Sequence, residues 1–390
     1  MQLLTALLCA ALCGLAQAAV PNARPAPSDR KFNSSAIEAL INSYQPRFLD
    51  PDLGTIFANC LPNTLDTAIL AWNSTDAFVI TGDIPAMWLR DSANQVAPFF
   101  ALASQDANLR SLLRGVVLRQ ARSVLIDAYA NAFNQEANGN GHQDDPRTPP
   151  MTKSVYEGKF ETDSLAAVLR SSTRYLNATG DTSLLDDEDW LSAMERILDT
   201  LVVQQQSTAE DGPRPAYAFG RPGSVYPNPK APANRTGLTK CGFRPSDDET
   251  GLPFLISANA MAAVELENLA GMTTGGSARL TKISARARAL GAELRAAIEA
   301  LALTTAPGFG VIYAYEIDGF GHASIADDSN VPSLLSLPYL GYTARDDPTY
   351  LATRAFLLST SNPYYYAGTV ASGIGSPHTP SGVVDARVCV

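Results

Sequence analysis

T-G-D-I-P-A-M-W-L-R-D-S-A-N-Q-V, residues 81–96, concentrates polar side chains among apolar neighbours. Two carboxylates, a guanidinium, an indole and two amides lie there beside a Gly and a Pro that forbid a continuous helix. Burying such groups without partners costs a few kcal/mol each, so each needs a partner in the fold or in a ligand. Two interpretations are open: a structural ion pair between Arg90 and Asp91, or a binding pocket.

The composition of the whole chain indicates a globular protein. Its 390 residues are 46% hydrophobic and 17% charged, enough to bury a large core in one large helical domain or in two ordinary ones. The net charge of −10 argues against a nucleic-acid partner and suits a soluble protein. We expect no metal site and no cofactor, because His142, His322 and His378 lack ligand spacing and no EF-hand, dinucleotide or phosphate loop occurs.

Residues 1–18 have the pattern of a signal peptide. Leu3–Leu15 is almost wholly apolar, and the small-x-small site that follows predicts cleavage after Ala18. We therefore expect a protein that is secreted or resides in the lumen of the secretory pathway, with no membrane contact after cleavage. The alternative is a signal anchor, because the apolar stretch approaches the ~18 residues that span a bilayer. Residues 19–33 are Pro-rich and polar, which predicts a flexible leader.

Most of the remaining chain shows helical periodicity. The clearest helix is expected over residues 108–133, where Leu and Val residues form one apolar face opposed by arginines. Strand signal is confined to residues 310–317, and residues 134–156 and 207–240 are expected to be long loops. Periodicity alone predicts a large all-α domain, with an α-solenoid as the rival. Further helices are expected at 34–44, 163–175, 187–206, 253–269, 278–303, 332–340 and 347–358.

Seven segments in one order resemble glycoside hydrolase family 125, the metal-independent, inverting exo-α-1,6-mannosidases. The resemblance covers about residues 38–382 and implies an all-α, (α/α)6 toroid of the six-hairpin glycosidase type over residues 34–382, incomplete at its C-terminal end. It also implies a monomer that acts on an α-mannoside oligosaccharide or N-glycan-type substrate. Besides T-G-D-I-P-A-M-W-L-R-D-S, the segments are N-C-L-P-N-T-L-D-T (59–67), F-E-T-D-S-L (160–165), F-R-P-S-D-D (243–248), Y-E-I-D-G-F-G (315–321), D-D-S-N-V-P-S-L-L-S-L-P-Y-L-G (327–341) and G-I-G-S-P-H-T-P-S-G (373–382).

The resemblance also implies which residue is the general acid of the hydrolysis. Inverting hydrolysis needs a protonated carboxyl near the leaving oxygen and an ionised carboxyl that activates water. In F-E-T-D-S-L, Glu161 and Asp163 stand at a loop-to-helix junction, where a carboxyl could simply cap the helix. The family pattern places the general acid at Asp163, whose pKa would have to be raised by burial or by carboxylates such as Glu161.

Sugar recognition is expected from the remaining motifs. Arg90 and Asp91 can hydrogen-bond vicinal hydroxyls, and Trp88 offers an apolar face to the sugar ring. The alternatives are an internal Arg–Asp clamp in F-R-P-S-D-D and a loop-anchoring role for His378. Asp318, Asp327 and Asp328 are weaker candidates because they are ordinary turn residues. The residues expected to bind substrate are Asp83, Trp88, Arg90, Asp91, Glu161, Arg244, Asp247, Asp248 and His378.

The resemblance stops at Gly382. In the family, further helices follow, with an H-E-S-F motif whose Glu is the proposed base; no H-E-S-F occurs in this sequence, and residues 383–390 resemble nothing in the family. We therefore expect a shortened chain with little inverting hydrolysis, since each proton-transfer group contributes typically 10² to 10⁴-fold. The alternatives are a non-hydrolytic mannoside-binding pseudoenzyme and a helical scaffold that binds protein.

Cysteine usage leaves two alternatives open. Removal of the signal peptide would leave Cys60, Cys241 and Cys389. A disulfide between Cys60 and Cys241 suits an oxidising compartment, and two buried free thiols are the other alternative.

Overall fold

The structure, a computed structural model, describes residues 19–221, 224–273 and 276–378. It divides into two compact units, Met1–Ile69 and Leu70–Val390. The predicted signal peptide, residues 379–382 of the last family segment, the C-terminal tail and Cys389 lie outside the described residues.

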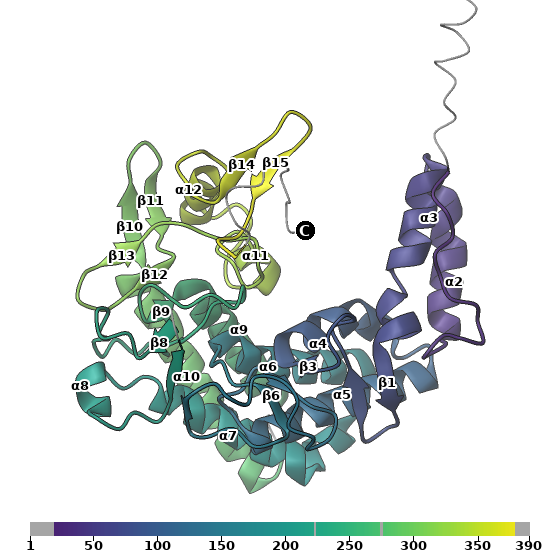
Figure 1. Ribbon diagram of the computed structural model, residues 1–390, viewed down its shortest axis with the longest axis horizontal. Helices are drawn as coiled ribbons and strands as arrows, with labels where there is room; N and C mark the ends of the chain where they lie inside the picture. Colours follow the sequence, from purple (N-terminus) through teal and green to yellow (C-terminus); the bar gives the residue numbers. More distant parts are fainter. Residues whose placement is uncertain (1–18, 222–223, 274–275, 379–390) are drawn as a thin grey trace, which may run out of the picture. The chain divides into compact units, whose positions relative to one another are not determined.

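The described residues of the N-terminal unit form two α-helices, α2 (Ser35–Tyr44) and α3 (Pro51–Cys60) (Figure 1). Their starts follow local rules: the Ser34 side chain accepts a hydrogen bond from Ile37 N, and Asp50 caps α3 ahead of a Pro at the first helical position. The predicted helix at 34–44 is therefore confirmed. Between and after the helices lie η1 (Gln45–Arg47) and a π-helical turn, η2 (Thr64–Ala68).

The Pro-rich segment 19–33 is anchored within this unit. The Arg24 side chain is 8% exposed, and its Nε lies 2.8 Å from Asp66 Oδ2 while its Nη2 lies 2.6 Å from Glu38 Oε1. The buried Phe32 donates its N–H to Leu65 O at 3.0 Å. The composition predicts a flexible leader, whereas the structure holds this segment by specific contacts. Composition does not reveal that Arg24 pairs with Asp66, a carboxylate far along the chain.

The longer helices of the C-terminal unit pack in two layers (Figure 1). In the inner layer, α4 contacts α6 and α6 contacts α9; both α6 and α9 are buried over most of their length. In the outer layer, α5 packs on α6, α10 packs on α9, and α7 contacts both α5 and α10. This pairing of inner with outer helices agrees with the predicted α/α architecture. The bounds are α4 (Leu89–Val96), α5 (Ala107–Ile126), α6 (Thr162–Thr179), α7 (Glu188–Val203), α9 (Ile256–Met272) and α10 (Ala278–Leu301).

Local signals set several helix ends, and tertiary structure sets others. Asp187 caps α7 through Trp190 N, and α6 ends at Gly180 with φ of 64°, a left-handed conformation that suits glycine. The helix expected over 108–133 is shorter: it ends at Ile126, and residues 132–133 form a strand. Shorter helical elements are η3 (Ala97–Leu102), η4 (Thr182–Asp186), α8 (Thr208–Asp211), α11 (Leu337–Leu340) and α12 (Pro348–Leu357).

Short antiparallel strands occur well beyond residues 310–317, so the prediction that strand signal is confined there is wrong. The strands are two to four residues long, too short for an alternating pattern to be recognised in sequence. They join in the orders β1-β2, β3-β4-β6, β5-β7-β8, β13-β12-β9, β10-β11 and β14-β15. Their bounds are β1 (Ile69–Trp72), β2 (Ala77–Val79), β3 (Met87–Trp88), β4 (Ala132–Phe133), β5 (Arg147–Thr148), β6 (Val155–Glu157), β7 (Ala218–Arg221), β8 (Ser224–Tyr226), β9 (Phe254–Leu255), β10 (Leu303–Ala306), β11 (Gly310–Tyr313), β12 (Glu316–Ile317), β13 (Ala323–Ser324), β14 (Tyr365–Ala367) and β15 (Ser372–Ile374).

Gly115 lets α5 approach the turn between β1 and β2 closely. A Cβ at this position would lie 2.3 Å from Asn73 O and 2.9 Å from Asp76 O. Ala is normally favoured over Gly in a helix interior by about 1 kcal/mol, but here the clash is with backbone that cannot rotate away. We expect Gly115→Ala to lower the free energy of unfolding by about 1–3 kcal/mol in urea denaturation. Gly271→Ala in α9, whose Cβ would meet nothing within 4 Å, is the control and should not destabilise. Equal stability of the two variants would contradict this account.

Candidate active site

The stretch 81–96 runs from an exposed turn through β3 into α4. Trp88 is buried with Ala86 and Ala132, and Tyr156 packs against it with ring centroids 5.5 Å apart. Pairing of β3 with β4 therefore fixes the start of α4, and Arg90 is the second residue of that helix.

Arg90 joins two buried carboxylates that lie far along the chain. Its Nη1 is 2.6 Å from Glu161 Oε2 and 3.1 Å from Asp163 Oδ2. Its Nη2 is 3.4 Å from Asp91 Oδ2, so the expected pair of neighbours exists but is the longest of the three contacts. Arg90 is 8% exposed, Glu161 1% and Asp163 0%. One guanidinium thus serves two fully buried acids.

The start of α6 leaves the Glu161 carboxylate available for this cluster. Glu161 is the N-cap, but its side chain binds Arg90 and Asn131 instead of capping the helix. The N–H of Thr162 donates instead to Cys241 Sγ at 3.3 Å, and the thiol donates to Phe243 O at 2.8 Å. Burial raises the pKa of Cys241 to about 12, so the thiol keeps the proton that it donates.

The cysteines of the described residues are free thiols. Cys60 is exposed and Cys241 is buried. The structure therefore agrees with the alternative of free thiols and not with a Cys60–Cys241 disulfide. That alternative expected both thiols to be buried, and only Cys241 is.

The capping role of Cys241 can be tested by substitution. Cys241→Val fills similar space but leaves the Thr162 N–H and Phe243 O buried without this partner, so we expect a loss of about 1–3 kcal/mol in the free energy of unfolding. Cys241→Ser keeps a donor and an acceptor and should lose less. Urea denaturation of the two variants measures the difference. A Val variant as stable as the Ser variant would show that the thiol hydrogen bonds contribute nothing.

Burial raises the pKa of both Glu161 and Asp163. The charge of Arg90 opposes this shift in both residues, and the nearby charge of Asp247 adds to it. Asp163 Oδ1 is buried and has no hydrogen-bond partner among the described residues. A raised pKa and an unengaged oxygen are the properties that a general acid at Asp163 requires.

A pocket of about 410 Å³ lies beside Arg90. Its walls come from α4, the turn at 245–247, the loop at 330–331 and residues 376–378. Most of its side chains can donate or accept hydrogen bonds, as a carbohydrate site requires. The lining residues are Arg90, Asp91, Asn94, Gln95, Pro245, Ser246, Asp247, Asn330, Val331, Ser376 and His378.

The charged residues of the F-R-P-S-D-D turn have different surroundings: Arg244 forms an internal ion pair, whereas Asp247 lines the pocket. Arg244 Nε lies 2.7 Å from Glu316 Oε1, which is an internal clamp, although with a Glu and not with the expected Asp. Asp247 has φ of 67° and lines the pocket. Asp248 Oδ1 lies 3.4 Å from His378 Nδ1 at the rim.

The structure brings together some of the predicted site residues and not others. Arg90, Asp91, Asp247 and His378 line the pocket, Glu161 and Asp163 lie behind Arg90, and Asp248 reaches His378. Five residues expected to bind substrate are not among the lining residues. Glu161 contacts Arg90, Asp248 contacts His378, and Arg244 is paired with Glu316. The other two are Asp83, which is exposed and accepts a hydrogen bond from Thr81 Oγ1 at 3.1 Å, and Trp88, which is in the buried cluster. Their roles in binding stay predictions.

The sequence did not single out Asn131, Glu157 and Lys159, which extend the charged cluster. Asn131 Nδ2 donates to Glu157 Oε2 at 2.9 Å and to Glu161 Oε1 at 3.2 Å. Lys159 Nζ lies 3.1 Å from Glu157 Oε1. One signal was present: residues 157, 159 and 161 are charged at every second position, which places them on one side of an extended segment.

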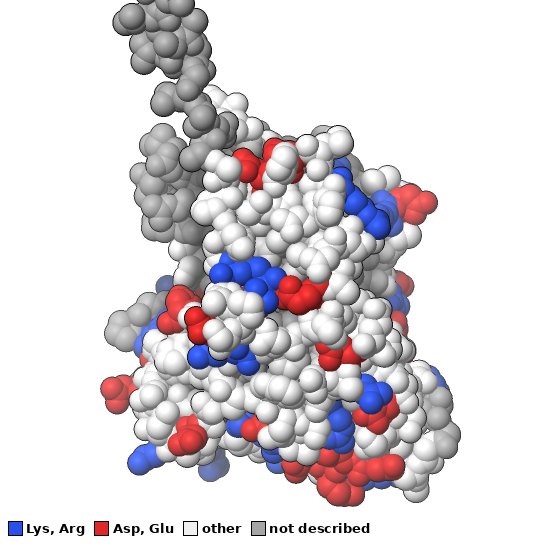
Figure 2. Space-filling model, turned by 90° about the vertical axis from the view of Figure 1, so that its right-hand side faces the viewer, with Lys and Arg blue, Asp and Glu red and all other residues white. Residues whose placement is uncertain are grey.

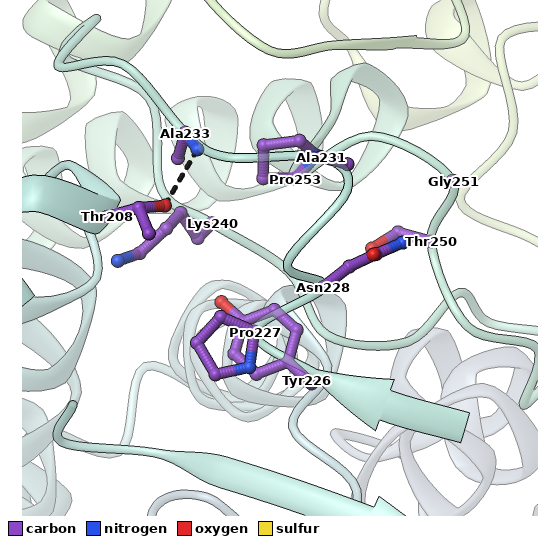
Figure 3. Close-up of a pocket in the computed structure, with 10 residues that line it drawn as sticks. All are labelled: Thr208, Tyr226, Pro227, Asn228, Ala231, Ala233, Lys240, Thr250, Gly251 and Pro253. Atoms are coloured by element: carbon purple, nitrogen blue, oxygen red, sulfur yellow. Dashed lines mark hydrogen bonds between the residues drawn. The ribbon is translucent and has the colours of Figure 1, made fainter. Parts of the chain in front are cut away.

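The described chain has other pockets, one of about 420 Å³ beside Arg114 and Asp181 and one of about 580 Å³ beside Arg174 and Tyr339. The cavity in Figure 3 has a volume of about 10 Å³, room for roughly one water, and its Lys240 is paired with Asp211. Figure 2 shows one face, on which basic and acidic residues are interspersed. Within residues 19–378, gaps excepted, no three His, Cys, Asp or Glu side chains are grouped as for a metal ion. The helices in the same part of the chain are each too short or too polar to cross a bilayer.

Comparisons with known proteins agree on one relationship. Residues 50–385 match the sequence family described as metal-independent α-mannosidases (GH125). The meiotically up-regulated gene 157 protein of Schizosaccharomyces pombe is 40% identical over 383 residues, 92% of this chain and 74% of that protein. A Streptococcus pneumoniae structure from a family of metal-independent α-mannosidases, in a non-productive complex with α-1,6-mannobiose, is 37% identical with a TM-score of 0.83; the match covers 90% of this chain and 82% of that one.

Proposed function

Because this chain belongs to glycoside hydrolase family 125, the metal-independent α-mannosidases, we propose that it removes terminal α-1,6-linked mannose with inversion of configuration. Membership confirms the predicted six-hairpin fold class and the assignment as a glycoside hydrolase that acts on mannosides. The linkage, the stereochemistry and the residue roles are our proposal, and we expect slow hydrolysis because the proposal assigns an acid but no base.

The observation that carries the proposal is the Arg90 cluster beside the polar pocket. Arg90 and Asp91 line the pocket as neighbours, so they can bind vicinal hydroxyls of a terminal sugar. Asp163 Oδ2 lies 3.1 Å from Arg90 Nη1. Burial raises the pKa of Asp163, which favours the protonated form that can donate to the leaving oxygen.

The substrate class and the location follow from similarity and from the N-terminal pattern. The pneumococcal structure contains α-1,6-mannobiose, which supports that linkage for this chain. We propose N-glycan-type α-mannosides as substrates, met in the lumen of the secretory pathway or outside the cell. The apolar N-terminal stretch supports this location.

The test is mannose release from α-1,6-mannobiose, followed by ¹H NMR. We expect β-mannose as the first product, no loss of rate in EDTA, and slower release from α-1,2- and α-1,3-mannobiose. Retention of the α-anomer would contradict the inverting mechanism. Absence of release from all three disaccharides would contradict hydrolysis by this chain.

A second candidate is mannoside binding without hydrolysis. One observation favours this candidate: Asp163 is 0% exposed and does not line the pocket. A sugar in the pocket would therefore meet Arg90 before it meets this acid. Calorimetric binding of α-1,6-mannobiose by a chain that releases no mannose would support this candidate.

A further inference from the structure

Lys159 is a buried cation between two carboxylates of the site. It is 4% exposed, and its Nζ lies 3.1 Å from Glu157 Oε1 and 3.7 Å from Asp247 Oδ1. The ammonium also lies 5.6 Å from the centroid of the Phe243 ring. A buried ammonium is costly unless it is paired, so its position between two acids is a specific arrangement.

Asp247 is the member of this group that reaches the pocket. It is the one described non-glycine residue with positive φ, 67°, a conformation that is uncommon and tends to occur at functional sites. Its Oδ1 is buried without a hydrogen-bond partner in the described structure, and its ion-pair partner is Lys159. The side chain as a whole is 33% exposed, so the other carboxylate oxygen is available to a ligand.

We propose that Lys159 is a positioning residue that holds Asp247 in place to accept hydrogen bonds from a sugar hydroxyl. This inference rests on the proposed function, because it concerns the same pocket. Lys159 joins the segment between β6 and α6, which carries Glu161, to the turn at residues 244–248, which lines the pocket.

The surroundings of Lys159 explain why its charge matters. Glu157 contacts Asn131 and, at 3.8 Å, the ring of His142, and Asn131 leads on to Glu161. The negative charge of Asp247 contributes to the raised pKa of Arg90, of Glu161 and of Asp163. Without the ammonium, Asp247 and Glu157 would repel each other, and the turn would lose the contact that orients Asp247.

The experiment compares Lys159→Met with Lys159→Arg and with a matched control, Lys240→Met. Lys240 is also buried, at 3% exposure, and paired with one carboxylate, Asp211, outside the pocket. We expect Lys159→Met to weaken α-1,6-mannobiose binding by at least about tenfold in calorimetry. Lys159→Arg should recover most of the affinity, and Lys240→Met should leave it within about twofold even if it lowers stability.

A double-mutant cycle with Asp247→Asn separates positioning from folding. If Lys159 acts through Asp247, the variant carrying Asp247→Asn and Lys159→Met binds no more weakly than Asp247→Asn alone. Additive losses, or equal losses in Lys159→Met and Lys240→Met, would overturn the inference. Binding needs no turnover, so a chain that binds but does not hydrolyse refutes only the proposed reaction. Failure of the unsubstituted chain to bind mannobiose overturns both.

Discussion

Asp163→Asn is expected to lower kcat/KM for α-1,6-mannobiose by at least about 10²-fold, because the amide has the shape of the carboxyl but cannot deliver a proton. Mannobiose affinity should stay within a few-fold, since Asp163 lies behind Arg90 and does not line the pocket. Initial rates and calorimetry on the same preparation check both parts. A variant with near-normal rates would remove Asp163 from the mechanism.

The same substitution should change how stability depends on pH. Burial raises the pKa of Asp163 and of Glu161 above the ordinary values of 3.8 and 4.5. A carboxyl whose pKa is raised on folding stabilises the fold while it is protonated, and this contribution is lost as pH rises through the folded-state pKa. The amide that Asp163→Asn introduces has no such proton to lose, so this variant should gain stability relative to the parent as pH rises above the ordinary carboxyl range. Urea denaturation at several pH values measures this, and a pH-independent difference would contradict it.

Arg90→Met is expected to be the most destabilising substitution in the site, by about 3–5 kcal/mol. It removes the cation that lies 2.6 Å from Glu161 and 3.1 Å from Asp163, and both acids are fully buried. Without Arg90, an ionised acid would be an uncompensated buried charge and a protonated acid would lose its hydrogen-bond partner, and either is more costly than the loss of an exposed ion pair. The total stability of a protein is typically only about 5–15 kcal/mol.

Two further variants make the Arg90 prediction specific. Arg279→Met removes an arginine that pairs with Glu188 and Glu195 at the surface, and it should cost at most about 1 kcal/mol. Adding Glu161→Gln and Asp163→Asn to Arg90→Met should restore part of the lost stability, because no buried charge then lacks a partner. If Arg90→Met costs no more than Arg279→Met, the cluster is not held by charge.

Much of the local structure was predictable from the sequence. Ser34 and Asp187 begin α2 and α7 as caps, and Gly180 ends α6, because capping and helical periodicity depend on residues within one or two turns. The family motifs likewise predicted one site with Arg90 and Asp163, whose side chains lie 3.1 Å apart; their roles stay predictions.

Tertiary structure decided which charges meet. The contact of Arg90 with Glu161 spans 71 residues, and Arg24 binds Asp66 across 42. Neither pairing has a local signal, since both depend on how helices and loops pack. The same holds for Lys159 and Asp247, and for strands of two residues whose pairing, not their composition, makes them strands. The sequence by itself determined the helices and the residue types of the site. Burial and through-space distance determined which acids have a raised pKa, which arginine is a clamp, and which carboxylate faces the pocket.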